Sequence, residues 1–159
     1  MNKAAYKQDF EIRRATVNDI DSIQNLLYPD YFKETVFKGL TYNAANTRLM
    51  IEGYVSQKFV LVAETKGEIV GFAVLLVGNT YYNEIEADVE FFCIRSDYRG
   101  SALARALAGD ILFAAETFGA TVFYAACASG IDEHNDALWK NLWSKFGFKK
   151  LGTVMIKGT

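Results

Sequence analysis

The chain has 159 residues, of which 51% are apolar and 14% aromatic, enough for one domain with a sizeable core and too apolar for a disordered chain. Its 17 Lys and Arg against 19 Asp and Glu give a net charge of −2, so it has no general attraction for nucleic acid or membrane surfaces. No apolar stretch approaches the roughly 20 residues of a bilayer span, and residues 1–14 lack the apolar core of a secretion signal. We therefore predict a single cytoplasmic domain over residues 1–159 that binds neither nucleic acid nor membrane.

The cysteine and histidine content argues against a metal site. Cys93 and Cys127 both lie in apolar, strand-like runs, where buried thiols in a reducing compartment fit better than the alternative of one disulfide. The chain has one histidine, His134, and no Cys-x-x-Cys motif. We expect no metal.

The first part of the chain predicts one strand and two helices. Apolar and polar residues alternate in the predicted strand Phe10–Ala15. A helix follows as far as residue 27, with Asn18 as its expected N-cap. Residues 28–42 are irregular and rich in aromatic side chains, and a second helix is predicted over Ala44–Val55.

The middle of the chain predicts three strands and the strongest helix. Two strands within residues 59–78 flank Gly67, which suits a hairpin turn, and the apolar run Ile85–Ile94 predicts a central strand. Ser101–Phe118 is the strongest helix, because one apolar stripe follows its length and Gly119 can end it. The stripe consists of Leu103, Leu107, Ile111, Ala115 and Phe118.

The last part predicts a buried strand at residues 121–127, a helix over 132–146 and a closing strand over 148–157. In that helix, Leu138, Leu142 and Phe146 share one face, and Gly147 follows its end. The resulting order is β-α-α-β-β-β-α-β-α-β. Short turns between consecutive strands imply an antiparallel meander, and the later β-α-β alternation implies a parallel crossover. We therefore predict an α/β (α+β) fold with a single-layer mixed, mostly antiparallel sheet flanked by helices.

The segment RSDYRGSALARAL, residues 95–107, places a turn of small residues between an apolar strand and a helix. The first N–H groups of a helix lack intrahelical partners, and a compact anion can bind them where side chains are small. Arg99 and Arg105 add positive charge. The alternative is a tight connection whose small residues only let the helix pack. Neither a P-loop nor a dinucleotide-binding motif occurs in the chain.

The stretch FFCIRSDYRGSALARAL resembles the acyl-CoA-binding segment of the GNAT superfamily of N-acetyltransferases, whose signature is Gln or Arg, two residues, Gly, one residue, then Gly or Ala. Here Ala102 stands at the central Gly, and Ser96 replaces the usual preceding proline. Residues 11–27, 67–77 and 142–152 resemble other family segments in the same order. The resemblance implies a GNAT-like acyl-CoA N-acyltransferase fold.

The resemblance also implies a site for acetyl-CoA as cosubstrate. Phe92, Cys93 and Ile94 would pair with its pantetheine arm as an extra strand. Asn135 matches an asparagine that contacts this arm, one residue farther from Trp143 than the family spacing. Backbone N–H groups would hold the pyrophosphate, from Arg99, Gly100, Ser101, Ala102, Leu103 and Ala104.

Acetyl transfer to an amine needs a base for the ammonium and a proton for the leaving thiolate. Glu90 is the expected base, because it interrupts an apolar strand in which family members often carry Glu. Burial would raise the pKa of its carboxyl group and so make it a better base. The alternative is a solvated or ion-paired Glu90. Trp143 replaces the family's usual acid, a tyrosine, and an indole is no acid near pH 7. Tyr98 or Tyr124 then supplies the proton, or the thiolate leaves as the anion, or catalysis is impaired.

Two weaker alternatives are an acyl-enzyme through Cys93 or Cys127 and His134 as the base. In the family, the segment that corresponds to residues 28–42 walls the acceptor site, and its rings favour an apolar or aromatic acceptor. The acidic stretch 81–90 instead favours a cationic amine.

The leading interpretation is an N-acetyltransferase that transfers acetyl from acetyl-CoA to a primary amine of a small molecule or peptide, by direct attack in a ternary complex. A GNAT-like acyl-CoA-binding module without turnover is the first alternative, which Ala102 and Trp143 favour. A structural protein whose turn only serves packing is the second. Dimers are frequent in the family, so a homodimer is one expectation, although no residue demands it.

Overall fold

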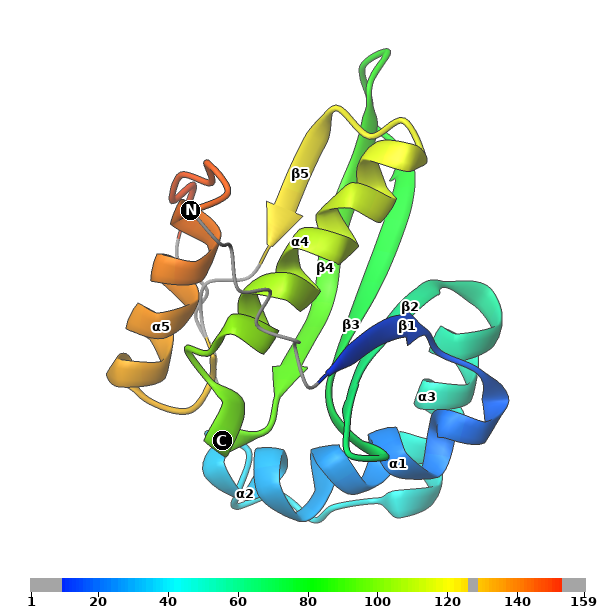
Figure 1. Ribbon diagram of the computed structural model, residues 1–159, viewed down its shortest axis with the longest axis vertical. Helices are drawn as coiled ribbons and strands as arrows, with labels where there is room; N and C mark the ends of the chain where they lie inside the picture. Colours follow the sequence, from blue (N-terminus) through cyan, green and yellow to red (C-terminus); the bar gives the residue numbers. More distant parts are fainter. Residues whose placement is uncertain (1–9, 126–128, 153–159) are drawn as a thin grey trace, which may run out of the picture.

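The structure is a computed structural model that describes residues 10–125 and 129–152. Within these residues five strands form one sheet in chain order (Figure 1), β1 (Glu11–Arg14), β2 (Phe59–Thr65), β3 (Glu68–Asn79), β4 (Ile85–Ile94) and β5 (Val122–Ala125). The pairs from β1 to β4 are antiparallel, and β5 is parallel to β4. The predicted mixed, mostly antiparallel sheet is confirmed.

Helices cover both faces of this sheet. One face packs against a cluster that includes side chains of α1 (Ile20–Asn25) and α3 (Ala44–Gln57), with Val62 and Phe72 from the sheet. The other face packs against α4 (Ala102–Thr117) and α5 (Glu133–Ser144). Figure 1 shows α4 crossing in front of β3 and β4, with α5 to its left. Shorter helical segments are η1 (Val17–Asp19), η2 (Leu26–Tyr31), α2 (Phe32–Glu34) and η3 (Ser96–Tyr98).

The β2–β3 hairpin is closed by two residues in the left-handed region. Lys66 has φ of 51° and Gly67 has φ of 79°. Two consecutive left-handed residues match the right-handed twist of the strands they join. The predicted turn at Gly67 is confirmed.

Thr16, not Asn18, caps the first helical segment, so the expected N-cap is corrected. Thr16 has extended backbone angles, and its N–H and hydroxyl donate to the carboxylate of Asp19 at 2.8 and 3.0 Å. A carboxylate three residues after the cap satisfies donors that the helix start leaves open. The cap therefore lies two residues earlier than the sequence pattern indicated.

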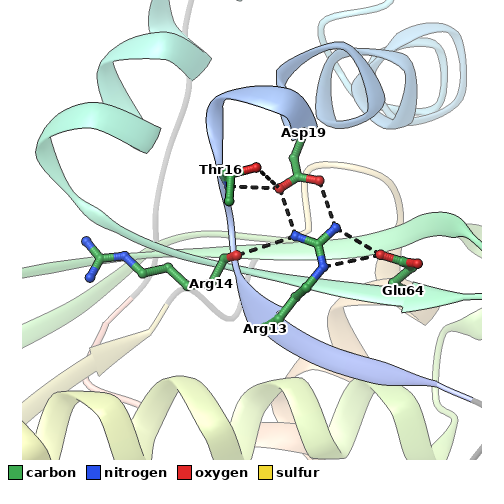
Figure 2. A network of polar contacts seen from close by, with 5 residues as sticks. All are labelled: Arg13, Arg14, Thr16, Asp19 and Glu64. Atoms are coloured by element: carbon green, nitrogen blue, oxygen red, sulfur yellow. Dashed lines mark hydrogen bonds and ion pairs between the residues drawn. The ribbon is translucent and has the colours of Figure 1, made fainter.

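Arg13 connects this cap to the sheet (Figure 2). Two of its guanidinium nitrogens donate to the carboxylate of Asp19, each at 2.8 Å, and the Glu64 carboxylate accepts from Nε and Nη2 at 3.2 and 2.8 Å. Hydrogen bonding from Arg13 is the largest cause that lowers the pKa of Asp19 to about 2. The network fixes β1, β2 and the start of α1 relative to one another.

The long helices match their predicted bounds closely, but two side chains expected in the core are exposed. The α4 stripe is buried from Leu103 to Ala115, whereas Phe118 is 48% exposed and packs edge-on against Phe59. On α5, Leu142 is buried but Phe146 is 39% exposed. Both exceptions lie at or just beyond a helix end, where the chain leaves the sheet.

The closing strand predicted over 148–157 is not formed in its described part, since residues 148–152 are irregular. Residues 153–157 of that prediction, and 126–127 of the preceding predicted strand, lie outside the described residues.

Candidate active site

The N-terminus of α4 has backbone N–H groups with no acceptor among the described residues. The N–H groups of Arg99 and Ser101 donate to carbonyls of η3 at 3.3 and 3.2 Å, and that of Ala104 donates to the Ser101 hydroxyl at 3.5 Å. These contacts leave three of the six predicted groups available, those of Gly100, Ala102 and Leu103. The predicted anion-binding site therefore has three available N–H groups instead of six.

Gly100 gives this turn its shape. Its φ of +73° lies in the left-handed region, which glycine adopts without strain. The residue after it, Ser101, is extended and caps α4. A bare left-handed residue directly before a cap exposes the adjoining N–H groups, as anion binding at a helix start requires.

A cavity of about 120 Å³ opens between this turn and α5, and we call it the α4 cavity. It brings together six of the predicted site residues, Ile94, Arg99, Gly100, Ser101, Ala104 and Asn135. Arg105 and Lys145 also line it, so it combines open N–H groups with cationic side chains. This is the electrostatic environment that phosphate groups prefer.

The side chain of Arg99 holds elements together at the edge of this cavity. Its Nη1 lies 2.9 Å from a Glu34 carboxylate oxygen and 3.3 Å from the Asn135 side-chain oxygen. Its Nε donates to the carbonyl of Ile94 at 3.1 Å. The guanidinium therefore ties α2, the end of β4 and the start of α5 to the turn.

Asn135 is oriented by the cap of α5. The Asp132 carboxylate accepts from its backbone N–H at 2.7 Å and from its side-chain amide at 2.9 Å. With its amide oxygen directed to Arg99, this side chain forms a fixed part of the cavity wall.

A second cavity lies beside the part of β4 that follows its pairing with β5. Among the described residues, the two strands pair from Glu86 to Val89, and β4 continues to Ile94. The cavity, here called the β4 cavity, has a volume of about 170 Å³. The described residues that line it are Tyr31, Val89, Glu90, Phe91, Phe92, Ser129, Trp139 and Trp143.

Residues from both faces of the sheet meet in the β4 cavity. Tyr31 and Phe91 pack with the α1 and α3 cluster, whereas Phe92 and Trp143 pack with the α4 and α5 cluster. Trp139 lines both the α4 cavity and the β4 cavity, so the two cavities adjoin at its ring. Its ring meets Phe92 edge-on, with centroids 5.1 Å apart.

Glu90 lies in the wall of the β4 cavity, but it is not buried as the sequence hypothesis assumed. Its carboxylate forms an ion pair with Lys58, and 33% of its side chain is exposed. The Lys58 ammonium also lies 4.8 Å from the ring centre of Tyr54. The ion-paired alternative for Glu90 is the one found, because β4 turns this side chain toward α3.

Acidic side chains continue along β4 beside Glu90. Burial is the largest cause that raises the pKa of Asp88, followed by the negative charges of Glu90 and Glu86. Lys58 opposes this rise. This part of the sheet therefore has a negative potential that a cation relieves.

Tyr31 lines the β4 cavity and follows a kink in the helical segment η2. Tyr28 has extended angles (φ −132°, ψ 129°) within the helical segment η2, and the proline that follows it in the sequence disfavours helical backbone there. The Tyr31 hydroxyl donates to the carbonyl of Ser129 at 3.2 Å, and its ring meets Phe91 edge-on at 5.7 Å. Burial, as the largest cause, raises the pKa of Tyr31 to about 12.

Sequence reasoning missed Tyr31 as an individual site residue. The available signal was the aromatic segment 28–42, but its irregular pattern has no period from which one ring can be selected. Only the long-range contacts with Ser129 and Phe91 distinguish Tyr31 from its aromatic neighbours.

Several other candidates lie outside the two cavities. Cys93 is 1% exposed, packs with the α1 and α3 cluster and lines neither cavity. His134, Tyr98 and Tyr124 also line neither, and Cys127 falls outside the described residues. Ala102 is exposed at the helix start and Leu103 is buried, so each offers its N–H rather than its side chain. Trp143 does line the β4 cavity, but it is only 3% exposed and packs against Phe92 and Phe148.

None of the helices within residues 10–125 and 129–152 is long and apolar enough to cross a membrane. The same residues contain no group of three or more His, Cys, Asp or Glu side chains arranged to hold a metal ion.

The fold resembles that of solved acetyltransferases. An aminoglycoside acetyltransferase from an uncultured soil metagenomic sample, in complex with trehalose, is 17% identical with a TM-score of 0.72, over 96% of this chain and 97% of that chain. A Trypanosoma brucei acetyltransferase is 18% identical with a TM-score of 0.68, over 95% and 100%. Aminoglycoside N-acetyltransferase AAC(6')-Iy, in complex with CoA, is 14% identical with a TM-score of 0.69, over 94% of each chain. At these identities the likeness shows the fold alone.

The family follows from the sequence match. The model of the acetyltransferase (GNAT) family matches residues 20–148. The chain therefore belongs to the GNAT acetyltransferase family, which confirms the resemblance found in the sequence. Among curated proteins, none matches this chain.

Proposed function

We propose that this protein is an acetyl-CoA-dependent N-acetyltransferase that joins the acetyl group to a primary amine by direct attack in a ternary complex. The observation that carries the proposal is the continuity of the site. Open N–H groups at the start of α4 adjoin one cavity. That cavity meets the second at Trp139, beside Glu90 and the part of β4 that does not pair with the described part of β5.

The residues present fit acetyl-CoA. The N–H groups of Gly100, Ala102 and Leu103, with Arg105 and Lys145 nearby, would hold its pyrophosphate. The edge of β4 from Phe92 to Ile94 offers backbone groups to the amides of its pantetheine arm. Asn135 would border this arm in the α4 cavity. Acetyl-CoA supplies the activated acyl group.

Glu90 is the proposed base for the acceptor. A primary amine is an ammonium ion near pH 7 and must lose a proton before its nitrogen can attack. Glu90 already holds the ammonium of Lys58, so its position suits an ammonium ion. An acceptor would replace Lys58 at this carboxylate.

The negative charge along β4 favours a cationic amine over an uncharged aromatic acceptor. Glu86 and Glu90 both act electrostatically on Asp88, and a polyamine or aminoglycoside would neutralise these charges. Two of the similar structures are aminoglycoside acetyltransferases by name, which agrees with a small polycationic acceptor. A single domain, a cytoplasmic location and a homodimer stay predictions from the sequence.

A binding module without turnover is the second candidate. The Lys58–Glu90 ion pair and the indole of Trp143 in place of a tyrosine favour it. The two candidates differ in turnover, whereas both require binding of acetyl-CoA.

Binding is tested by thermal-shift titration with acetyl-CoA, CoA and ATP on the wild type and on two variants of Ala102. A ligand at 100 times its Kd that binds only the native state adds about 2.7 kcal/mol of stability. Ala102→Glu suits the first turn of α4 and preserves the fold, but it repels a pyrophosphate and is expected to abolish the shift. Ala102→Gln has the same length without the charge and should retain most of the shift. The absence of any shift at millimolar acetyl-CoA would overturn the proposed function.

A further inference from the structure

We propose that the hydroxyl of Tyr31 donates the proton that the leaving thiolate of CoA takes up. The inference rests on the proposed function and assigns a step that this function leaves open. Breaking the carbon–sulfur bond leaves an electron pair on sulfur, and a positioned donor lowers the barrier to that step.

Tyr31 is selected by elimination among the side chains that line the β4 cavity. Val89, Phe91 and Phe92 carry no side-chain donor. Trp139 and Trp143 have indole N–H groups, which donate hydrogen bonds but, unlike a phenol, do not ionise as acids in proteins.

The remaining polar side chains have other partners. The hydroxyl of Ser129 donates to the carboxylate of Asp136 at 2.7 Å, and Glu90 is paired with Lys58. Tyr31 donates only to a backbone carbonyl, at 3.2 Å, and a phenolic O–H can rotate about its C–O bond toward another acceptor. Among these lining side chains, Tyr31 therefore supplies the acidic O–H.

The surroundings hold Tyr31 in place and keep it protonated until it is needed. Its ring contacts those of Phe32 and Phe91 edge-on, with both centroid distances 5.7 Å. Its hydroxyl donates to the carbonyl of Ser129, which follows β5 in the chain. Burial raises its pKa to about 12, and the charge of Cys93 acts in the same direction. The positive charge of Arg99 opposes both and would stabilise the phenolate that forms after donation.

The step balances. The amine nitrogen forms a bond to the acetyl carbon, the carbon–sulfur bond breaks, and the sulfur takes the Tyr31 proton to give free CoA thiol. The ammonium of the acceptor releases one proton to Glu90 before the attack, and the nitrogen releases a second proton after its bond to carbon has formed. Both protons pass to solvent, and the Tyr31 phenolate regains one from solvent. The net change is ammonium plus thioester to amide plus thiol plus one proton.

The experiment compares the wild type with Tyr31→Phe, which removes one oxygen and keeps the ring contacts. Thiol release from acetyl-CoA is followed in buffer alone and with kanamycin, spermidine and a lysine-containing peptide as amine probes. The expected result is a fall in kcat of about 100-fold with an unchanged KM for acetyl-CoA and an unchanged thermal shift by CoA. Tyr82→Phe, at an 82% exposed tyrosine beyond β3, is the matched control and should leave the rate unchanged.

Each other outcome has a defined meaning. If Tyr31→Phe releases thiol at the wild-type rate, or differs from the wild type only in KM, Tyr31 is not the proton donor. The proposed function is not affected by that result. A wild type that binds acetyl-CoA but releases no thiol with any probe overturns both catalytic proposals and leaves the binding module. If acetyl-CoA causes no thermal shift in the wild type, acetyl-CoA is not a ligand of this protein, and the proposed function is wrong as well.

Discussion

The ammonium of Lys58, at the end of α3, is ion-paired with the carboxylate of Glu90. Glu90 lies on β4 just beyond the residues that pair with β5. This contact puts a cation of the protein itself where the proposed mechanism requires the ammonium of an acceptor. The pair is partly exposed, with 23% of the Lys58 side chain accessible, so it can exchange with a ligand.

Replacement of Lys58 by Gln should therefore strengthen acceptor binding. An accessible ion pair is worth about 0.2–1 kcal/mol, so its removal should lower the KM of a cationic acceptor by up to about fivefold. The KM for acetyl-CoA should not change, because Lys58 lines neither cavity. Steady-state kinetics measure both values. Lys66→Gln, in the β2–β3 turn, is the charge-matched control, and a higher acceptor KM in Lys58→Gln would contradict the model.

Glu90→Gln should lower kcat by about 100-fold, because the amide cannot accept the ammonium proton. The rate is measured with the best amine probe at saturating acetyl-CoA. Glu86→Gln removes a neighbouring charge from the same strand and should preserve most of the rate. A Glu90→Gln rate that matches the wild type would assign the base to another group.

Asp19→Asn should destabilise the fold at neutral pH but not at low pH. Arg13 lowers the pKa of Asp19 from 3.8 to about 2, so the stabilisation is present above pH 4 and is lost as the pH falls toward 2. The shift corresponds to about 2 kcal/mol at pH 7. Urea unfolding at pH 7 and near pH 2 measures the difference. Asp21→Asn, at a carboxylate that is 75% exposed, is the control and should have little effect at either pH.

Two glycine-to-alanine substitutions should change stability in opposite directions. At Gly71 in β3, a Cβ would lie 2.7 Å from a methyl carbon of Ile94 and 3.1 Å from the carbonyl of Cys93, so overpacking should cost about 1–3 kcal/mol. At Gly53 within α3, nothing lies within 4 Å of a Cβ, and Ala should stabilise the helix by about 0.5–1 kcal/mol. Chemical unfolding of both variants tests this, and equal effects would show that the two environments are misassigned.

Local signals made much of the fold predictable. The α4 boundaries follow from Ser101, Gly119 and an apolar stripe, all of which act within a few turns of helix. The hairpin follows from Gly67, where two left-handed residues meet. The cap at Thr16 was missed, because Thr16 and Asn18 are both good cap residues, and the Asp19 carboxylate, which accepts from Thr16 and from Arg13, favours the first.

The sequence by itself determined the order of the main helices and strands as far as α5, the small-residue turn before α4 and the family, since these depend on neighbours along the chain. The tertiary structure alone decided how the site residues are used. In it, Glu90 is ion-paired with Lys58 and Arg99 is ion-paired with Glu34. The hydroxyl of Tyr31 donates to the carbonyl of Ser129. Each of these contacts joins residues at least 32 positions apart. Sequence periodicity carries information about the face of one element, whereas such contacts depend on how several elements pack together.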